Sequence, residues 1–368
     1  MTSLKLRKTH RTFKILWGIT GALFILFYIV RRNKETADWI IRYIAAPVRE
    51  TMGFLTSPLP FSVAEVFYTA VIIGSAVFLI LTVREIIRKP GWKEKLRVLG
   101  WRLSVLLLIP VMIWTGYSWL WAIGYYGSTF AERSGWTVPG VEFQDLEKAA
   151  SYFAEEASKR SGKVKRDAEG HFAETDFWEN TEDLYTAIEK EFPTLKKRPL
   201  NPKPMFYSKI MSAMGFTGFY FPFTGEANVN RDFPPALQPV TIAHEMAHQR
   251  RVAAEEEANF VGVTASILSD DVVYQYSGYL QGLMLLSGPL YRASPEAWGR
   301  ISAELSPQVH QDWQDNSQYW KQFESPVEST ATAVYDSYLK HNDQEAGIRS
   351  YGECVDLLVL YYKTKTEG

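Results

Sequence analysis

The sequence contains a single cysteine, Cys354, among its 368 residues, which excludes an intramolecular disulfide framework. Cys354 lies in an apolar helical pattern with Val355, Leu358 and Val359, so we expect it to pack rather than to act as a nucleophile. The chain also lacks internal repeats and low-complexity tracts. With 46% hydrophobic residues, it has ample material for a hydrophobic core.

The chain has almost no net charge, at −1, but the charges are unevenly distributed. Residues 1–124 carry 17 lysines and arginines against 6 acidic residues, a balance of +11. Residues 125–368 carry 23 against 35, a balance of −12. We infer that the two parts lie in different surroundings.

Three uncharged runs dominate the basic part, at residues 15–30, 66–83 and 103–124. Each is near or above the length that crosses about 30 Å of hydrocarbon, so we predict three transmembrane helices. Arg31 and Arg32 directly follow the first run, and no small-residue cleavage pattern precedes them. This favours an uncleaved anchor over a signal peptide.

Basic residues near these runs predict the orientation. Five precede the first run, seven lie between the second and third, and five lie between the first and second. Because cytoplasmic loops carry an excess of lysine and arginine, we expect the N-terminus inside and residues 127–368 outside the cytoplasmic membrane.

After a membrane anchor at 1–126, we predict a helical linker region at 127–200 and a further domain at 201–368. Amphipathic spacing predicts helices over 143–160 and 181–192. Prolines in 196–204 break helical structure and indicate an extended entry to this further domain.

The aromatic, β-prone stretch 216–230 is punctuated by glycine and proline, so we predict strands joined by a turn. One strand could offer its edge to an extended peptide substrate, or the strands could form ordinary sheet core. Glu226 could contact substrate or hold the turn. After Asn259 the pattern is helical, with breaks at Gly288, Pro289, Pro295 and Pro307. The uncharged stretch 272–291 contains polar and glycine residues, which favours a buried helix over a fourth membrane span.

His244, Glu245 and His248 form the motif His-Glu-Met-Ala-His. Residues four apart share a helical face, so both imidazoles can reach one zinc ion while Glu245 lies beside it as a general base. The longer pattern His-Glu-x-x-His-x-x-Gly-x-x-His does not match this sequence. Arg251 stands in place of its glycine, and Ala254 stands in place of its third histidine.

Glu255 is the predicted third metal ligand. On a continuous helix it would lie about 10 Å beyond His248, so the chain must turn back within residues 249–254. A second helix starting near Ala253 would present Glu255 and Asn259 on one face, where Asn259 accepts a hydrogen bond from a ligand imidazole. Glu256 and Glu257 remain competing ligands.

Several stretches resemble the bacterial membrane proteins grouped as domain of unknown function 3810. They are residues 222–230, 244–250, 255–260, 276–280, 350–352 and 355–358. The resemblance implies a membrane-anchored, metallopeptidase-like protein with glycine expected where Arg251 stands. The spacing of Glu255 and Asn259 also resembles the wider zinc peptidase group with a glutamate ligand, where aspartate more often replaces Asn259.

We therefore predict an α+β, mainly helical chain, with three transmembrane helices followed by a zincin-like metallopeptidase domain that contains a small β-sheet. Its function would be zinc-dependent hydrolysis of peptide bonds, with Zn²⁺ bound by His244, His248 and Glu255. Expected partners are a polypeptide substrate and a lipid bilayer, and no nucleic acid; the sequence specifies no substrate-binding residues and no oligomeric state. Tyr276, Tyr279 and His310 are weak candidates for stabilising an oxyanion. The alternatives are a non-catalytic metal-binding sensor or assembly protein, and a structural membrane protein with a fortuitous motif.

Overall fold

The computed structural model describes residues 3–137, 140–173, 177–178, 181–342 and 351–367. The chain divides into two compact units. The first comprises Met1–Arg49 and Val63–Gly127, and the second comprises Glu50–Ser62 and Ser128–Gly368. Ser350, which contributed to the family resemblance, lies outside the described residues.

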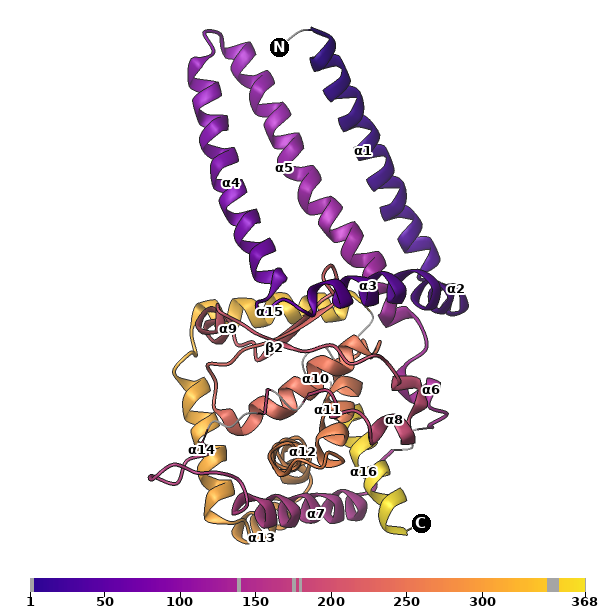
Figure 1. The fold of residues 1–368 in the computed structure, drawn as a ribbon, viewed down its shortest axis with the longest axis vertical. Coiled ribbons are helices and arrows are strands. Elements are labelled where there is room, and N and C mark those ends of the chain that lie inside the picture. Colours follow the sequence, from indigo (N-terminus) through magenta and orange to yellow (C-terminus); the bar gives the residue numbers. More distant parts are fainter. Residues whose placement is uncertain (1–2, 138–139, 174–176, 179–180, 343–350, 368) are drawn as a thin grey trace. The chain divides into compact units, whose positions relative to one another are not determined.

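The first unit is built from three long helices, α1 (Ser3–Val30), α4 (Val63–Arg88) and α5 (Trp92–Leu120) (Figure 1). All three are long and apolar enough to cross a membrane, as predicted. Helix α5 begins well before the predicted run, because residues 92–102 contain good helix formers and no proline. Shorter elements follow α1, namely α2 (Lys34–Ile40), a π-helical stretch (Ile41–Ala45) and α3 (Ala46–Thr56).

Two polar contacts join the long helices of the first unit. The indole of Trp119 on α5 donates to the carbonyl of Leu23 on α1 over 3.1 Å. Arg102 on α5 pairs with Glu85 on α4 over 2.7 Å. These contacts supplement apolar packing of α5 against both α1 and α4.

The second unit is mainly helical around a core that contains α12. Its helices are α6 (Phe130–Arg133), α7 (Phe143–Ser161), α8 (Ile188–Glu191), α9 (Ser208–Ala213), α10 (Gln238–Gln249), α11 (Glu255–Ile267), α12 (Val272–Ala293), α13 (Pro295–Ala303), α14 (Pro307–Lys321), α15 (Pro326–His341) and α16 (Tyr351–Glu367). Helix α12, drawn end-on in Figure 1, packs against α7, α10 and α11. The prediction of a buried helix over 272–291 is confirmed, and so is the helix over 143–160.

Serine and proline begin three successive helices. Ser294, Ser306 and Ser325 cap the N-termini of α13, α14 and α15, and each is followed by a proline at the first helical position. The predicted breaks at Gly288 and Pro289 are wrong, because α12 continues through both. The lost backbone hydrogen bond is offset by burial of Leu285, Leu286 and Leu290.

A small sheet with the order β1-β3-β2 confirms the predicted strands. Strand β1 (Lys203–Pro204) pairs in parallel with β3 (Glu226–Val229), and β2 (Gly218–Phe221) pairs antiparallel with β3. Gly225 has φ +68° in the turn between β2 and β3, a conformation that glycine adopts without strain. Helix α10 packs on β2 and β3, which places the edge strand β2 beside the His-Glu-Met-Ala-His motif.

The predicted helix over 181–192 is reduced to α8, and turns occupy the preceding residues. Leu184, Tyr185 and Ile188 are buried and anchor this segment to the core. The Tyr185 hydroxyl donates to the carbonyl of Ala243 on α10. Pro193 also disfavours helical backbone at the preceding residue. Tertiary anchoring has therefore overridden the local helical pattern.

Candidate metal centre

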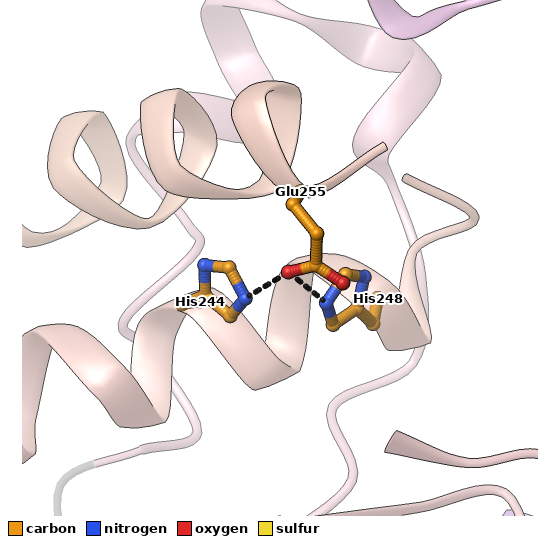
Figure 2. Close-up of side chains that lie close together, drawn as sticks. All are labelled: His244, His248 and Glu255. Carbon is orange, nitrogen blue, oxygen red and sulfur yellow. Dashed lines mark ion pairs between the residues drawn. The ribbon is translucent and has the colours of Figure 1, made fainter. Parts of the chain in front are cut away.

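His244, His248 and Glu255 converge where α10 and α11 meet (Figure 2). The Nε2 atoms of His244 and His248 lie 3.2 and 3.6 Å from one oxygen, Oε2, of Glu255. Each residue offers a ligand atom, and all three atoms lie within 4.8 Å of one another. The turn that the sequence required after His248 is present, because α10 ends at Gln249 and α11 begins at Glu255.

Backbone hydrogen bonds at the end of α10 reverse the chain. The N–H of Arg251 donates to the carbonyl of His248, and the N–H of Val252 donates to that of Ala247. These two bonds form a Schellman motif, whose penultimate residue adopts a left-handed conformation. Arg251 occupies that position with φ +68°, the one positive φ outside glycine in the described residues. The turn therefore needs left-handed backbone, which glycine adopts without strain. Arginine adopts the same backbone conformation with steric strain from its Cβ atom.

Replacement of Arg251 by glycine should stabilise the protein. A left-handed side-chain-bearing residue costs about 1–2 kcal/mol, and the greater entropy of unfolded glycine returns about half of that. We expect a net gain of about 0.5–1 kcal/mol, or roughly 1–2 °C in Tm. Thermal unfolding in detergent measures the gain. Arg251→Ala is the matched control and should show none of it, because alanine keeps the Cβ; an equal gain in both variants would contradict the strain.

Side chains from outside the motif hold the C-terminal part of α10. Lys197 donates to the carbonyl of Gln249 over 2.6 Å, at the negative end of the helix. The buried Arg250 pairs with Glu189 over 3.1 Å and lies over the Tyr185 ring. These contacts fix the helix that carries both imidazoles.

Gly262 lets α11 approach α10 closely. A Cβ atom there would lie 2.8 Å from the backbone nitrogen of His244 and 2.9 Å from its Cα. Any side chain at this position would push the helices apart, and with them Glu255 from His244. The close approach is thus a condition for the three ligand atoms to meet.

The two imidazoles differ in their second hydrogen bond. Nδ1 of His248 lies 2.7 Å from the carbonyl oxygen of Val252, to which it must donate, so Nε2 carries the lone pair that can bind a metal. Nδ1 of His244 is buried without a hydrogen-bond partner. The bond that we predicted from Asn259 to a ligand imidazole is therefore absent at His244, and at His248 a backbone carbonyl takes that place. Asn259 lies one turn after Glu255 on α11, half-buried.

The competing carboxylates on α11 lie outside the cluster. Glu257 accepts the backbone N–H groups of Phe130 and Ala131, over 2.7 and 2.8 Å, and so holds the start of α6. Burial raises the pKa of Glu257. Glu256 is also buried. Of the three successive glutamates, the one that meets both histidines is Glu255.

Glu245 lies buried beneath the edge strand. A Cβ atom on Gly218 of β2 would fall 2.5 Å from Oε1 of Glu245, so this strand passes directly over the carboxyl group. Its other oxygen is buried without a hydrogen-bond partner. Burial raises the pKa of Glu245 to about 7, against the opposing effect of His244 and His248. A pKa near neutrality suits a general base.

The donor atoms of the cluster suit a zinc ion. Burial alone would lower the pKa of His248, but the Glu255 carboxylate outweighs it and raises that pKa to about 9. Burial would raise the pKa of Glu255, yet the imidazoles hold it well below its usual range. Two imidazoles and a carboxylate form a common zinc donor set, and ligand atoms around tetrahedral zinc lie about 3.3 Å apart. The separations of 3.2 and 3.6 Å from Oε2 of Glu255 fit that arrangement, and all three ligand atoms lie within 4.8 Å of one another.

Tyr335 on α15 is a site residue that sequence reasoning missed. Its hydroxyl donates to Oε1 of Glu255 over 2.6 Å, whereas the imidazole nitrogens lie against the other oxygen, Oε2. The bond would hold the carboxylate in its ligand orientation. Eighty positions separate the two residues, and no spacing pattern connects them. The sequence therefore offered no signal for Tyr335.

We expect Tyr335→Phe to lower zinc affinity about 10- to 100-fold, since outer hydrogen bonds to metal ligands typically contribute that much. Competition with a chromophoric chelator measures the affinity. Tyr338→Phe is the matched control, because Tyr338 stacks on Tyr335 and comes from the same helix. Equal affinities for wild type and Tyr335→Phe would show that the hydroxyl does not position Glu255.

The weaker candidates named from the sequence have other surroundings. The Tyr276 hydroxyl bonds to Asp312, and the Tyr279 hydroxyl lies 3.3 Å from that of Tyr152. His310 is exposed on α14. Glu226 accepts a hydrogen bond from Thr224 over 2.8 Å within the β2–β3 turn. None of these contacts involves the three clustered side chains.

Residues 41–359 match the family model described as "Protein of unknown function (DUF3810)", and the chain belongs to this family. The matched range includes α4, α5 and the whole candidate metal centre, which confirms the family resemblance seen in the sequence motifs. No curated protein and no solved structure matches the chain.

Proposed function

We propose that this protein is a membrane-anchored zinc peptidase that hydrolyses peptide bonds outside the cytoplasmic membrane. The observation that carries the proposal is the meeting of His244, His248 and Glu255 around one point, with Glu245 on the same helix as the histidines. A purely structural metal site needs no buried base on that helix, whereas a hydrolytic one does.

His244 and His248 would bind the ion through Nε2, and Glu255 through Oε2. When bound, zinc would lower the pKa of water and polarise the scissile carbonyl. Glu245 would accept a proton from the attacking water as the carbon–oxygen bond forms. It would then donate that proton to the leaving amine nitrogen as the carbon–nitrogen bond breaks. Tyr335 would keep Glu255 oriented throughout.

Strand β2 supports a polypeptide as the substrate. It lies at the edge of the sheet, with β3 on its other side, and Gly218 on it packs against Glu245. An extended peptide can add to such an edge through main-chain hydrogen bonds. A substrate held this way would pass close to the general base. The position of β2 beside Glu245 would therefore suit a peptidase.

A comparison of protein N-termini in cells tests the proposal. Cells with the wild type should contain cleavage products that disappear with Glu245→Gln. Glu304→Gln is the matched control, because Glu304 is exposed at the end of α13 and should leave the products unchanged. Identical N-termini in wild-type and Glu245→Gln cells under varied growth conditions would oppose a peptidase and favour the non-catalytic sensor.

A further inference from the structure

Residues 50–62 belong to the second unit although they come from the N-terminal part of the chain. Thr56 donates to the carbonyl of Thr224 over 3.0 Å, in the β2–β3 turn. Ser62 bonds to the side chain of Asn228 on β3 over 2.6 Å. Lys203 on β1 donates to the carbonyl of Ser57 over 2.8 Å. The segment is therefore fastened to the same sheet that flanks Glu245.

This segment also exposes large apolar side chains. Phe54, Leu55 and Phe61 are 47%, 61% and 48% exposed, and Phe206, three residues beyond Lys203, is 86% exposed. We call this set, with Leu59 and Ile210, the apolar rim; its members are Phe54, Leu55, Leu59, Phe61, Phe206 and Ile210. Lys203, which binds the carbonyl of Ser57, links the two segments that carry these side chains, and large exposed apolar side chains mark a contact with a partner.

The charges around the apolar rim indicate the chemistry of that partner. Residues 50–62 and 196–213 contain five cationic side chains and a single carboxylate, Glu50. The balance for residues 125–368 as a whole is −12, so this region is a basic island in an acidic part of the chain. Arg198 lies 4.3 Å above the ring of Phe54, which combines cation and aromatic at one place. Aromatic and cationic side chains together suit the interface of a bilayer with anionic headgroups.

Chain connectivity brings the apolar rim to such a surface. Ser62 is followed directly by Val63, the first residue of α4, which is apolar enough to cross a membrane. Consecutive Cα atoms are about 3.8 Å apart, so Phe61 and Ser62 remain close to the point where α4 begins. We propose that the apolar rim of the second unit inserts into the headgroup layer of the bilayer, and that the exposed Lys196, Arg198 and Lys209 bind anionic lipid headgroups.

The proposal bears on the substrate. Because Ser62 binds Asn228, and Asn228 pairs with Phe219 of β2, the proposed peptide-binding edge would lie near the same lipid surface. This inference about substrates rests on the proposed function. If the protein is a peptidase, the substrates that reach the site are polypeptide segments next to the membrane. The docking itself requires no catalysis, so a measurement of insertion depth separates its failure from failure of the peptidase proposal.

Spin labels on the full-length protein in bilayers that contain phosphatidylglycerol test the docking. Cys354, the single cysteine, is fully buried, so the unmodified protein serves as the blank. Phe206→Cys and Leu55→Cys place labels on the apolar rim, and Ala303→Cys places one on an exposed part of α13. At each label we compare the ratio of the collision rate with oxygen to that with a water-soluble nickel complex. We expect this ratio to be several-fold higher at the two rim labels than at position 303.

Two outcomes would overturn the docking. Rim labels as accessible to nickel as the label at position 303 would mean that the rim lies in water. Rim labels shielded from both oxygen and nickel would mean that protein covers the rim, as in contact with a second copy. Two rim positions are used so that misfolding of one variant leaves the other to decide.

Discussion

Glu245→Gln should reduce peptide hydrolysis by about 10²- to 10⁴-fold while the protein keeps its zinc. Glutamine matches glutamate in size, so it fits beneath Gly218 and preserves the packing of α10 against β2. It cannot accept the proton of the attacking water, and the reaction loses its general base. The rate of cleavage of a polypeptide found in the N-terminal comparison measures the loss.

The zinc content of the two proteins shows whether the variant has lost the base or the metal. If both proteins contain equal zinc and only the variant has lost cleavage, Glu245 acts as the base and not as a metal ligand. Cleavage within a few-fold of wild type would contradict the assigned role of Glu245. Zinc binding without cleavage by either protein would favour the sensor or assembly protein instead.

Glu255→Ala should weaken zinc binding by more than 100-fold. The substitution removes the oxygen that lies 3.2 and 3.6 Å from the two imidazole nitrogens, and two imidazoles alone leave the ion short of a protein ligand. The expected loss exceeds the 10- to 100-fold typical of an outer hydrogen bond, such as that from Tyr335. Chelator competition on the purified full-length protein measures both.

Glu257→Gln is the matched control for Glu255→Ala. Glu257 comes from the same acidic triplet but binds the backbone of Phe130 and Ala131. Its replacement should weaken the anchoring of α6 and leave zinc affinity within a few-fold of wild type. Unchanged affinity in Glu255→Ala would transfer the ligand role to Glu256 or Glu257.

Features set by local sequence were predictable. Long apolar runs predict helices without knowledge of their neighbours, and α1, α4 and α5 follow them. Two histidines four residues apart share a helical face, and the rise of a helix required a turn before Glu255. The strain at Arg251 was also predictable, because Arg251 stands where the family resemblance implied glycine. Its φ of +68° is a conformation that glycine adopts more readily.

Features that depend on distant contacts were not predictable. The donation from Tyr335 to Glu255 joins α15 to α11, and the acceptor for His248 is a backbone carbonyl, which carries no residue identity. The close approach at Gly262 depends on the crossing of two helices. The segment 181–192 lost most of its helix for a similar reason, since buried anchors such as Tyr185 outweighed its periodicity.

The zinc content of the purified full-length protein, expressed in medium with zinc, tests the central claim most directly. Elemental analysis should find one zinc per chain in the wild type, and far less than one in His248→Ala, which removes the ligand whose orientation Val252 fixes. Less than about one zinc in ten wild-type chains, or equal zinc in the two proteins, would contradict a zinc site at His244, His248 and Glu255.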